Sequence, residues 1–133
     1  MVHRILVVDD EQHILQVLSL KLRNAGFEVH TACDGEEGLH LARSLAPDLV
    51  ITDVQMPYMT GLELSRVLAG DASTAATPVI ILTARGYALG DDDIDSPNIV
   101  EVISKPFSPR AVIDLVHSAL EGSAQGMGSR EAA

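Results

Sequence analysis

Short apolar runs alternate along this chain with segments whose apolar residues recur every three or four positions. The continuous runs predict buried strands at 4–8, 28–32, 48–52, 78–82 and 99–103, because strands covered on both faces lose the alternation of polar and apolar residues. The helical spacing predicts amphipathic helices at 12–25, 35–45, 61–68 and from 109 onward. This order favours an α/β domain with a parallel sheet and right-handed crossovers.

Residues typical of helix N-termini stand where three of these helices should begin. Asp34 can cap the second helix, with Glu37 at the third helical position. Thr60 and Glu63 have the spacing of a capping box before the third helix, and the intervening Gly61 is expected to let the chain turn there. Ser108 precedes a proline at the first position of the last helix.

Two segments depart from the regular pattern. A fourth helix would fall at 86–98, but two glycines, a proline and four aspartates in that stretch predict a short or irregular helix. Residues 122–133 have the composition of a flexible tail or the start of a linker. The expected organisation is therefore one compact domain at 1–121 followed by this tail.

Composition excludes several classes of protein. The chain has 47% hydrophobic residues but no tryptophan, which predicts an aliphatic core. A net charge of −10 argues against direct binding of nucleic acid by this domain. No apolar run is long enough for a membrane span or a signal peptide. Cys33 is the one cysteine, so no intrachain disulfide can form; we expect it in or near the core, and a reducing cytoplasm is the default compartment.

Polar side chains follow the predicted strands, and the carboxyl ends of parallel strands share one edge of a sheet. Clustered carboxylates at such an edge suit Mg²⁺, while one lysine and one hydroxyl can bind the oxygens of a phosphoryl group. A carboxylate can act as the acceptor in phosphoryl transfer. The residues at these positions are Asp9, Asp10, Glu11, Asp53, Thr83 and Lys105.

The three adjacent acids after the first strand raise an electrostatic question. Two like charges about 4 Å apart repel by roughly 4 kcal/mol at an effective dielectric constant of about 20, so a cation should lie near them or the acids must point apart. Asp9 and Asp10 alone would favour a helix cap, but the other strand-end residues favour a binding site. Glu11 is expected to stabilise the N-terminus of the first helix through the helix dipole.

Four short motifs occur in order at these strand ends: Asp-Asp at 9–10, D-V-Q-M-P-Y-M-T-G at 53–61, L-T-A at 82–84 and K-P-F at 105–107. Together they resemble the receiver domain of two-component response regulators, over about residues 4–121. The resemblance implies a flavodoxin-like, doubly wound, five-stranded parallel sheet of order 2-1-3-4-5 with helices on both faces. It also implies a signalling domain rather than an enzyme.

The resemblance further implies a role for each matching residue. Asp53 would be the phosphoacceptor, and Mg²⁺ would be bound by the side chains of Asp10 and Asp53 and the backbone carbonyl of Gln55, with help from Asp9. Thr83 would donate a hydrogen bond to one phosphoryl oxygen and Lys105 would pair with another. The bond between Lys105 and the following proline would be cis.

Partners follow from the same resemblance. A sensor histidine kinase or a histidine phosphotransfer protein would supply the phosphoryl group. A downstream protein target would respond to it, and the phosphorylated domain could pair with a second copy as a homodimer.

One position departs from the family pattern. Receivers usually have Tyr or Phe three residues before the lysine, with a ring that turns inward when the threonine moves; this chain has Val102 there. Tyr87 could substitute for that ring.

The valine at position 102 and the irregular segment at 86–98 motivate a second hypothesis, a receiver-like adaptor that binds its partner without phosphorylation. A third, a Mg²⁺-dependent phosphohydrolase with an Asp nucleophile, is disfavoured because such enzymes have D-x-D after the first strand.

Overall fold

The computed structural model describes residues 2–84 and 96–126. Its core element is one sheet in which every neighbouring pair of strands is parallel. The strand order is β2-β1-β3-β4-β5, as predicted. The strands are β1 (Arg4–Val8), β2 (Glu28–Ala32), β3 (Leu49–Asp53), β4 (Val79–Thr83) and β5 (Ile99–Ser104).

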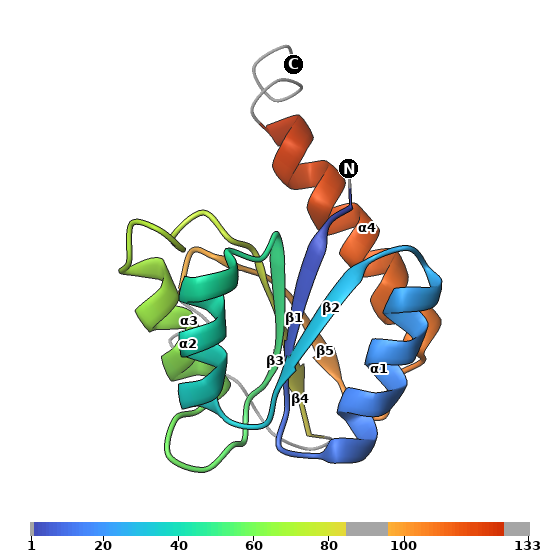
Figure 1. Ribbon diagram of the computed structural model, residues 1–133, viewed down its shortest axis with the longest axis horizontal. Coiled ribbons are helices and arrows are strands. Elements are labelled where there is room, and N and C mark those ends of the chain that lie inside the picture. Colours follow the sequence, from blue (N-terminus) through green and yellow to red (C-terminus); the bar gives the residue numbers. More distant parts are fainter. Residues whose placement is uncertain (1, 85–95, 127–133) are drawn as a thin grey trace.

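Helices cover both faces of this sheet (Figure 1). One face carries α1 and α4, and the opposite face carries α2 and α3. This arrangement confirms the predicted doubly wound architecture for the part of the chain that is described. The four helices are α1 (Gln12–Asn24), α2 (Gly35–Leu45), α3 (Gly61–Ala69) and α4 (Pro109–Gly126).

The core is divided between the two faces because successive strand residues point to opposite sides. In β1, Ile5 and Val7 join the cluster under α1 and α4, whereas Leu6 and Val8 join the cluster under α2 and α3. All four side chains are fully buried. Phe27 is the one aromatic residue among the buried core residues of the described chain, which agrees with the aliphatic core that composition predicts.

Strand boundaries place the polar residues at the strand ends. β3 and β4 each begin and end one residue later than predicted, so that Asp53 and Thr83 are the last residues of their strands. The later start of β4 has a local reason in Pro78, which has no N–H group to donate to a neighbouring strand. β5 continues one residue past its predicted end, to Ser104.

The predicted helix caps are present. The Asp34 side chain accepts a hydrogen bond from the backbone N–H of Glu37 at 2.8 Å, and the reciprocal capping box of Thr60 and Glu63 opens α3. The Ser108 hydroxyl accepts from a backbone N–H in the first turn of α4 at 3.0 Å. Local signals in the sequence therefore determine where these three helices start.

The expectation for Cys33 needs correction, and three others are not tested by the described residues. α4 continues to Gly126, five residues into the segment predicted as a tail or linker; the rest of that segment lies outside the described residues, so its role stays a prediction. Cys33 is exposed and not in the core, because β2 ends one residue before it. Most of the irregular helix predicted at 86–98 lies outside the described residues, and so does Tyr87.

None of the described helices is long and apolar enough to cross a membrane.

Replacing Thr60 with Ala should lower the free energy of unfolding by about 1 kcal/mol, because α3 loses its N-cap hydrogen bond. Chemical denaturation followed by circular dichroism measures this loss. Thr77→Ala is the matched control, since the Thr77 side chain makes no hydrogen bond within the described chain. Equal stability of the two variants would contradict the assigned cap.

Candidate functional site

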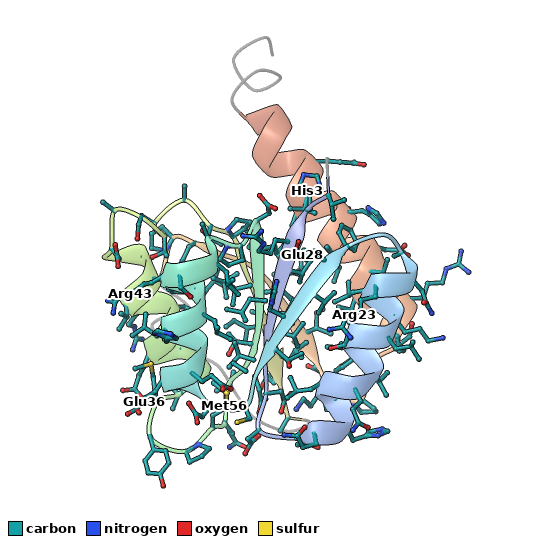
Figure 2. All side chains as sticks on the ribbon, viewed as in Figure 1. His3, Arg23, Glu28, Glu36, Arg43 and Met56 are labelled. Carbon is teal, nitrogen blue, oxygen red and sulfur yellow. The ribbon has the colours of Figure 1, made fainter. Side chains whose placement is uncertain are left out.

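The polar residues at the strand ends gather at one edge of the sheet. Asp9 directly follows β1, Asp53 ends β3, Thr83 ends β4 and Lys105 directly follows β5. In Figure 2 this edge lies at the bottom, where Met56 marks the loop after β3, and the opposite edge is marked by His3 and Glu28. The parallel sheet therefore brings together residues up to about a hundred positions apart in the sequence.

Three aspartates at this edge form a group suited to a cation. Asp9, Asp10 and Asp53 each offer one carboxylate oxygen, and these oxygens all lie within 4.8 Å of one another. Asp9 is 0% exposed and Asp53 only 4%, whereas Asp10 is exposed. Oxygen ligands in such a group, with one member open to solvent, fit a hard divalent cation that retains some of its water.

Burial makes the negative charges of this group costly. Burial raises the pKa of the Asp9 carboxyl above its usual range. Burial, and then the negative charge of Asp9, raise the pKa of Asp53 to about 6. A cation bound among these oxygens would remove that cost, so the aspartates present fit a magnesium ion.

Lys105 supplies the positive charge at the site among the residues that the structure describes. Its Nζ lies 3.1 Å from Asp9 Oδ2, 3.0 Å from Glu11 Oε1 and 3.4 Å from Asp53 Oδ1. Burial by itself lowers the pKa of Lys105, but the hydrogen bonds to Glu11 and Asp9 and the nearby carboxylate charges outweigh it, so the pKa is raised and the ammonium stays charged. The peptide bond to Pro106 is cis, as the resemblance implies.

Thr83 contributes a hydroxyl with no partner among the described residues. The residue is 4% exposed, and its Oγ1 is buried without a hydrogen bond. An unsatisfied buried polar group costs about 1–3 kcal/mol, so an incoming oxygen that accepts from this hydroxyl would be stabilised. The backbone also links the site, because the Lys105 N–H donates to the Thr83 carbonyl at 2.8 Å.

Gln55 lies in the loop after β3, and its side chain is exposed. The aspartates that could hold an ion are grouped without a side-chain contribution from Gln55. Its predicted role uses the backbone carbonyl, and that role stays a prediction. The structure thus brings together Asp9, Asp10, Asp53 and Lys105, places Thr83 at the same edge, and leaves the function of each as a hypothesis.

Gly61 has a role that differs from the expected one. A Cβ atom at this position would lie 2.0 Å from the backbone oxygen of Asp53, far inside van der Waals contact. The Gly61 N–H donates to the carbonyl of Val54 at 3.0 Å. Glycine is required here because the start of α3 packs directly against the backbone of the candidate acceptor, and not because the turn needs an unusual backbone angle.

Glu11 makes a contact at this site that sequence analysis did not predict, while its expected interaction with the dipole of α1 stays a prediction. It is the N-cap of α1, but its side chain makes no capping hydrogen bond and contacts Lys105 instead. Its backbone N–H donates to Asp9 Oδ1 at 2.9 Å. The available signal was its position at the same sheet edge as Lys105, next to two acids that need a cation.

Comparisons with known proteins agree with this site. A family model described as the response regulator receiver domain matches residues 5–117. The alkaline phosphatase synthesis transcriptional regulatory protein PhoP of Bacillus subtilis is 38% identical over 128 residues, covering 90% of this chain and 49% of PhoP. The DNA-binding response regulator MtrA of Mycobacterium tuberculosis is 35% identical over 125 residues, covering 88% of this chain and 50% of MtrA. The chain therefore spans about half the length of the curated relatives it matches.

Solved structures show the same architecture over nearly their whole length. The chemotaxis response regulator CheY4 of Vibrio cholerae has a TM-score of 0.81 and 30% identity, covering 89% of this chain and 98% of CheY4. A CheY-like response regulator receiver domain protein from Methanospirillum hungatei has a TM-score of 0.85 and 27% identity, covering 95% of this chain and 99% of that one.

Gly61→Ala should destabilise the protein by about 1–3 kcal/mol, because the added methyl group overlaps the Asp53 carbonyl. Thermal or chemical unfolding measures the loss. Gly70→Ala is the matched control, since a Cβ there meets its nearest atom at 3.6 Å, an ordinary contact. If Gly61→Ala were as stable as Gly70→Ala, the close approach would not constrain the site.

Asp53→Asn should stabilise the protein at about pH 7 when divalent cations are chelated. The folded-state pKa of about 6 lies above the ordinary value of 3.8, so the folded protein binds this proton more tightly than the unfolded chain. Ionisation of Asp53 therefore lowers stability as the pH rises between these two values, and the effect is absent at lower pH. The gain in the variant should be at most about 3 kcal/mol.

Urea denaturation of wild type and variant across this pH range, in EDTA, provides the measurement. Asp114→Asn, which removes an exposed carboxylate from α4, is the control. A variant no more stable than wild type at about pH 7 would show that burial does not penalise the Asp53 charge.

Proposed function

Because this chain belongs to the response regulator receiver domain family, we propose that it is the phosphoacceptor domain of a two-component system and that Asp53 accepts the phosphoryl group. The observation that carries this proposal is the surroundings of Asp53. Its buried carboxylate belongs to an oxygen cluster suited to a cation and lies 3.4 Å from an ammonium. A carboxylate in that position can attack phosphorus while the charges around it are neutralised.

Magnesium is the cofactor that this site would use. The side chains of Asp10 and Asp53 and the backbone carbonyl of Gln55 would bind it, with Asp9 assisting directly or through water. When bound, the ion would neutralise part of the charge on the transferred phosphoryl group. Support for this assignment comes from the three carboxylate oxygens within 4.8 Å and from the cost of leaving Asp53 ionised in their midst.

The transfer step uses groups that the chain already holds in place. An oxygen of Asp53 attacks the phosphorus of a phosphohistidine on the partner, the P–N bond breaks with its electron pair left on the imidazole, and an acyl phosphate forms on Asp53. The Lys105 ammonium pairs with one phosphoryl oxygen and limits the build-up of charge. The Thr83 hydroxyl, unpartnered in the described chain, donates to another.

Phosphorylation would then shift the population between two conformations of the domain. The usual aromatic ring is replaced by Val102, a half-buried residue of β5 packed against the cluster under α2 and α3. Valine has no ring to turn between surface and interior. The change at Thr83 must therefore be transmitted by the backbone and by side-chain packing around β4 and β5.

The proposed partners are a sensor histidine kinase or histidine phosphotransfer protein upstream and a protein target downstream, with a second copy of the domain as a further candidate target. Relatives whose names include DNA binding or transcriptional regulation are about twice as long as this chain. With a net charge of −10, this domain itself is poorly suited to contact nucleic acid. Any DNA binding by a longer protein would belong to another domain.

Incubation with acetyl phosphate and Mg²⁺ should add the mass of one phosphoryl group to the wild-type chain, as measured by intact mass spectrometry. Asp53→Ala should abolish the adduct, and Asp114→Ala, which removes an exposed carboxylate from α4, should leave it unchanged. EDTA should prevent labelling in every variant. An unlabelled wild-type chain beside a receiver that is labelled in the same tube would contradict the proposal, and so would full labelling of Asp53→Ala.

The same proteins separate phosphorylation-dependent signalling from an adaptor that acts without it. A target whose affinity is unchanged by Asp53→Ala and by beryllofluoride with Mg²⁺ would support the adaptor. An affinity that changes with beryllofluoride in wild type, and not in Asp53→Ala, would exclude it.

A further inference from the structure

We propose that Glu11 is a positioning residue that holds the Lys105 ammonium away from Asp53 and so favours the magnesium ion over the phosphoryl group. The inference rests on the proposed function and concerns how that site is regulated. It assigns to Glu11 an electrostatic role at the site beyond the expected interaction with the dipole of α1.

The distances show how Lys105 is shared. Its Nζ donates hydrogen bonds to Glu11 Oε1 at 3.0 Å and to Asp9 Oδ2 at 3.1 Å. The contact with Asp53 Oδ1 is longer, at 3.4 Å, and is an ion pair without a hydrogen bond of good geometry. The ammonium is therefore bound on the β1–α1 side of the site, with its weakest contact to the candidate acceptor.

Of the two hydrogen-bonded partners, Glu11 is the one that can release the ammonium at low cost. The Glu11 side chain is 58% exposed, so water can replace Lys105 around its carboxylate. Asp9 is fully buried and would be left as an uncompensated charge. When phosphoryl oxygens compete for Lys105, the bond to Glu11 is the one expected to break.

Glu11 contributes little else that would explain its position. Its side chain makes no capping hydrogen bond to α1, and the backbone N–H satisfies Asp9 whatever side chain the residue carries. Removing the carboxylate charge should therefore change the electrostatics of the site more than the fold around it.

The negative charge of Glu11 has opposite effects on the binding of Mg²⁺ and on the binding of the phosphoryl group. A carboxylate beside the site attracts Mg²⁺, and by pairing with Lys105 it also reduces the repulsion between the ammonium and the metal. The same carboxylate repels a phosphoryl group and competes with it for Lys105. Glu11→Gln should therefore weaken the binding of Mg²⁺ and strengthen the binding of a phosphoryl mimic.

The first measurement is titration of the full chain with MgCl₂ by isothermal titration calorimetry. Glu11→Gln should raise the Mg²⁺ dissociation constant about twofold to fivefold, the range of a partly exposed ion pair. Glu121→Gln removes an exposed carboxylate near the far end of α4 and should bind as wild type does. Glu11→Asp keeps the charge and should restore most of the affinity.

The second measurement is beryllofluoride binding at saturating Mg²⁺, followed by fluorine NMR, together with the initial rate of labelling by acetyl phosphate. Both should rise about twofold to fivefold in Glu11→Gln and stay unchanged in Glu121→Gln. Opposite shifts for the cation and the anion identify an electrostatic role, because a loss of structure would weaken both.

The possible results separate this inference from the function on which it rests. If wild type binds neither Mg²⁺ nor beryllofluoride, the proposed function fails and the inference fails with it. If wild type binds both, but Glu11→Gln matches Glu121→Gln or weakens both ligands, the inference alone is overturned. Equal losses of Mg²⁺ affinity in Glu11→Gln and Glu11→Asp would assign Glu11 a structural role and would also overturn it.

Discussion

The structure of this site depends on the burial of two carboxylates, those of Asp9 and Asp53, at the ends of neighbouring strands. Like charges about 4 Å apart repel by roughly 4 kcal/mol even at an effective dielectric constant of about 20. Lys105 relieves part of that repulsion, but one ammonium faces the carboxylates of Asp9, Asp10, Glu11 and Asp53. The excess of negative charge makes a divalent cation favourable at this edge, and the cation in turn makes a dianionic phosphoryl group acceptable. Each ion in the proposed reaction compensates for the charge of the one before it.

The fold keeps these charges close by holding the backbone on every side of them. The Lys105 N–H donates to the Thr83 carbonyl at 2.8 Å, which fixes the end of β5 against the end of β4. Gly61 packs closely on the Asp53 carbonyl. Side chains on such rigid elements keep their positions better than side chains on free loops. The free energy that offsets the repulsion between the closely spaced carboxylates comes from the aliphatic packing of the two core clusters.

Features that depend on local sequence were predictable, and features that depend on a distant partner were not. Apolar periodicity and cap residues such as Asp34 and Thr60 located the elements to within a residue or so at most ends, and the parallel arrangement then placed Asp53 and Lys105 at one edge. The position of Glu11 at the sheet edge made a contact with Lys105 possible, but local sequence did not decide it, because an exposed carboxylate can interact either with its own helix or with a lysine 94 residues away. Cys33 was misplaced because its hydrophobic neighbours in sequence end one residue before it. The tight contact at Gly61 requires knowledge of how α3 packs on β3, which no short motif specifies.

A buried polar network connects the backbone at Asp53 with the start of β5. The Ser65 hydroxyl donates to the Gly61 carbonyl at 2.8 Å, and the Ser65 carbonyl accepts from Asn98 Nδ2 at 3.0 Å, immediately before β5. Gly61 touches the backbone of Asp53, so these contacts run without a break from the acceptor through α3 to the start of β5. Leaving one of these buried groups unpaired costs about 1–3 kcal/mol. The backbone of Asp53, the start of α3 and the residues before β5 are therefore expected to move together, because moving one of them alone would leave a buried polar group unpaired.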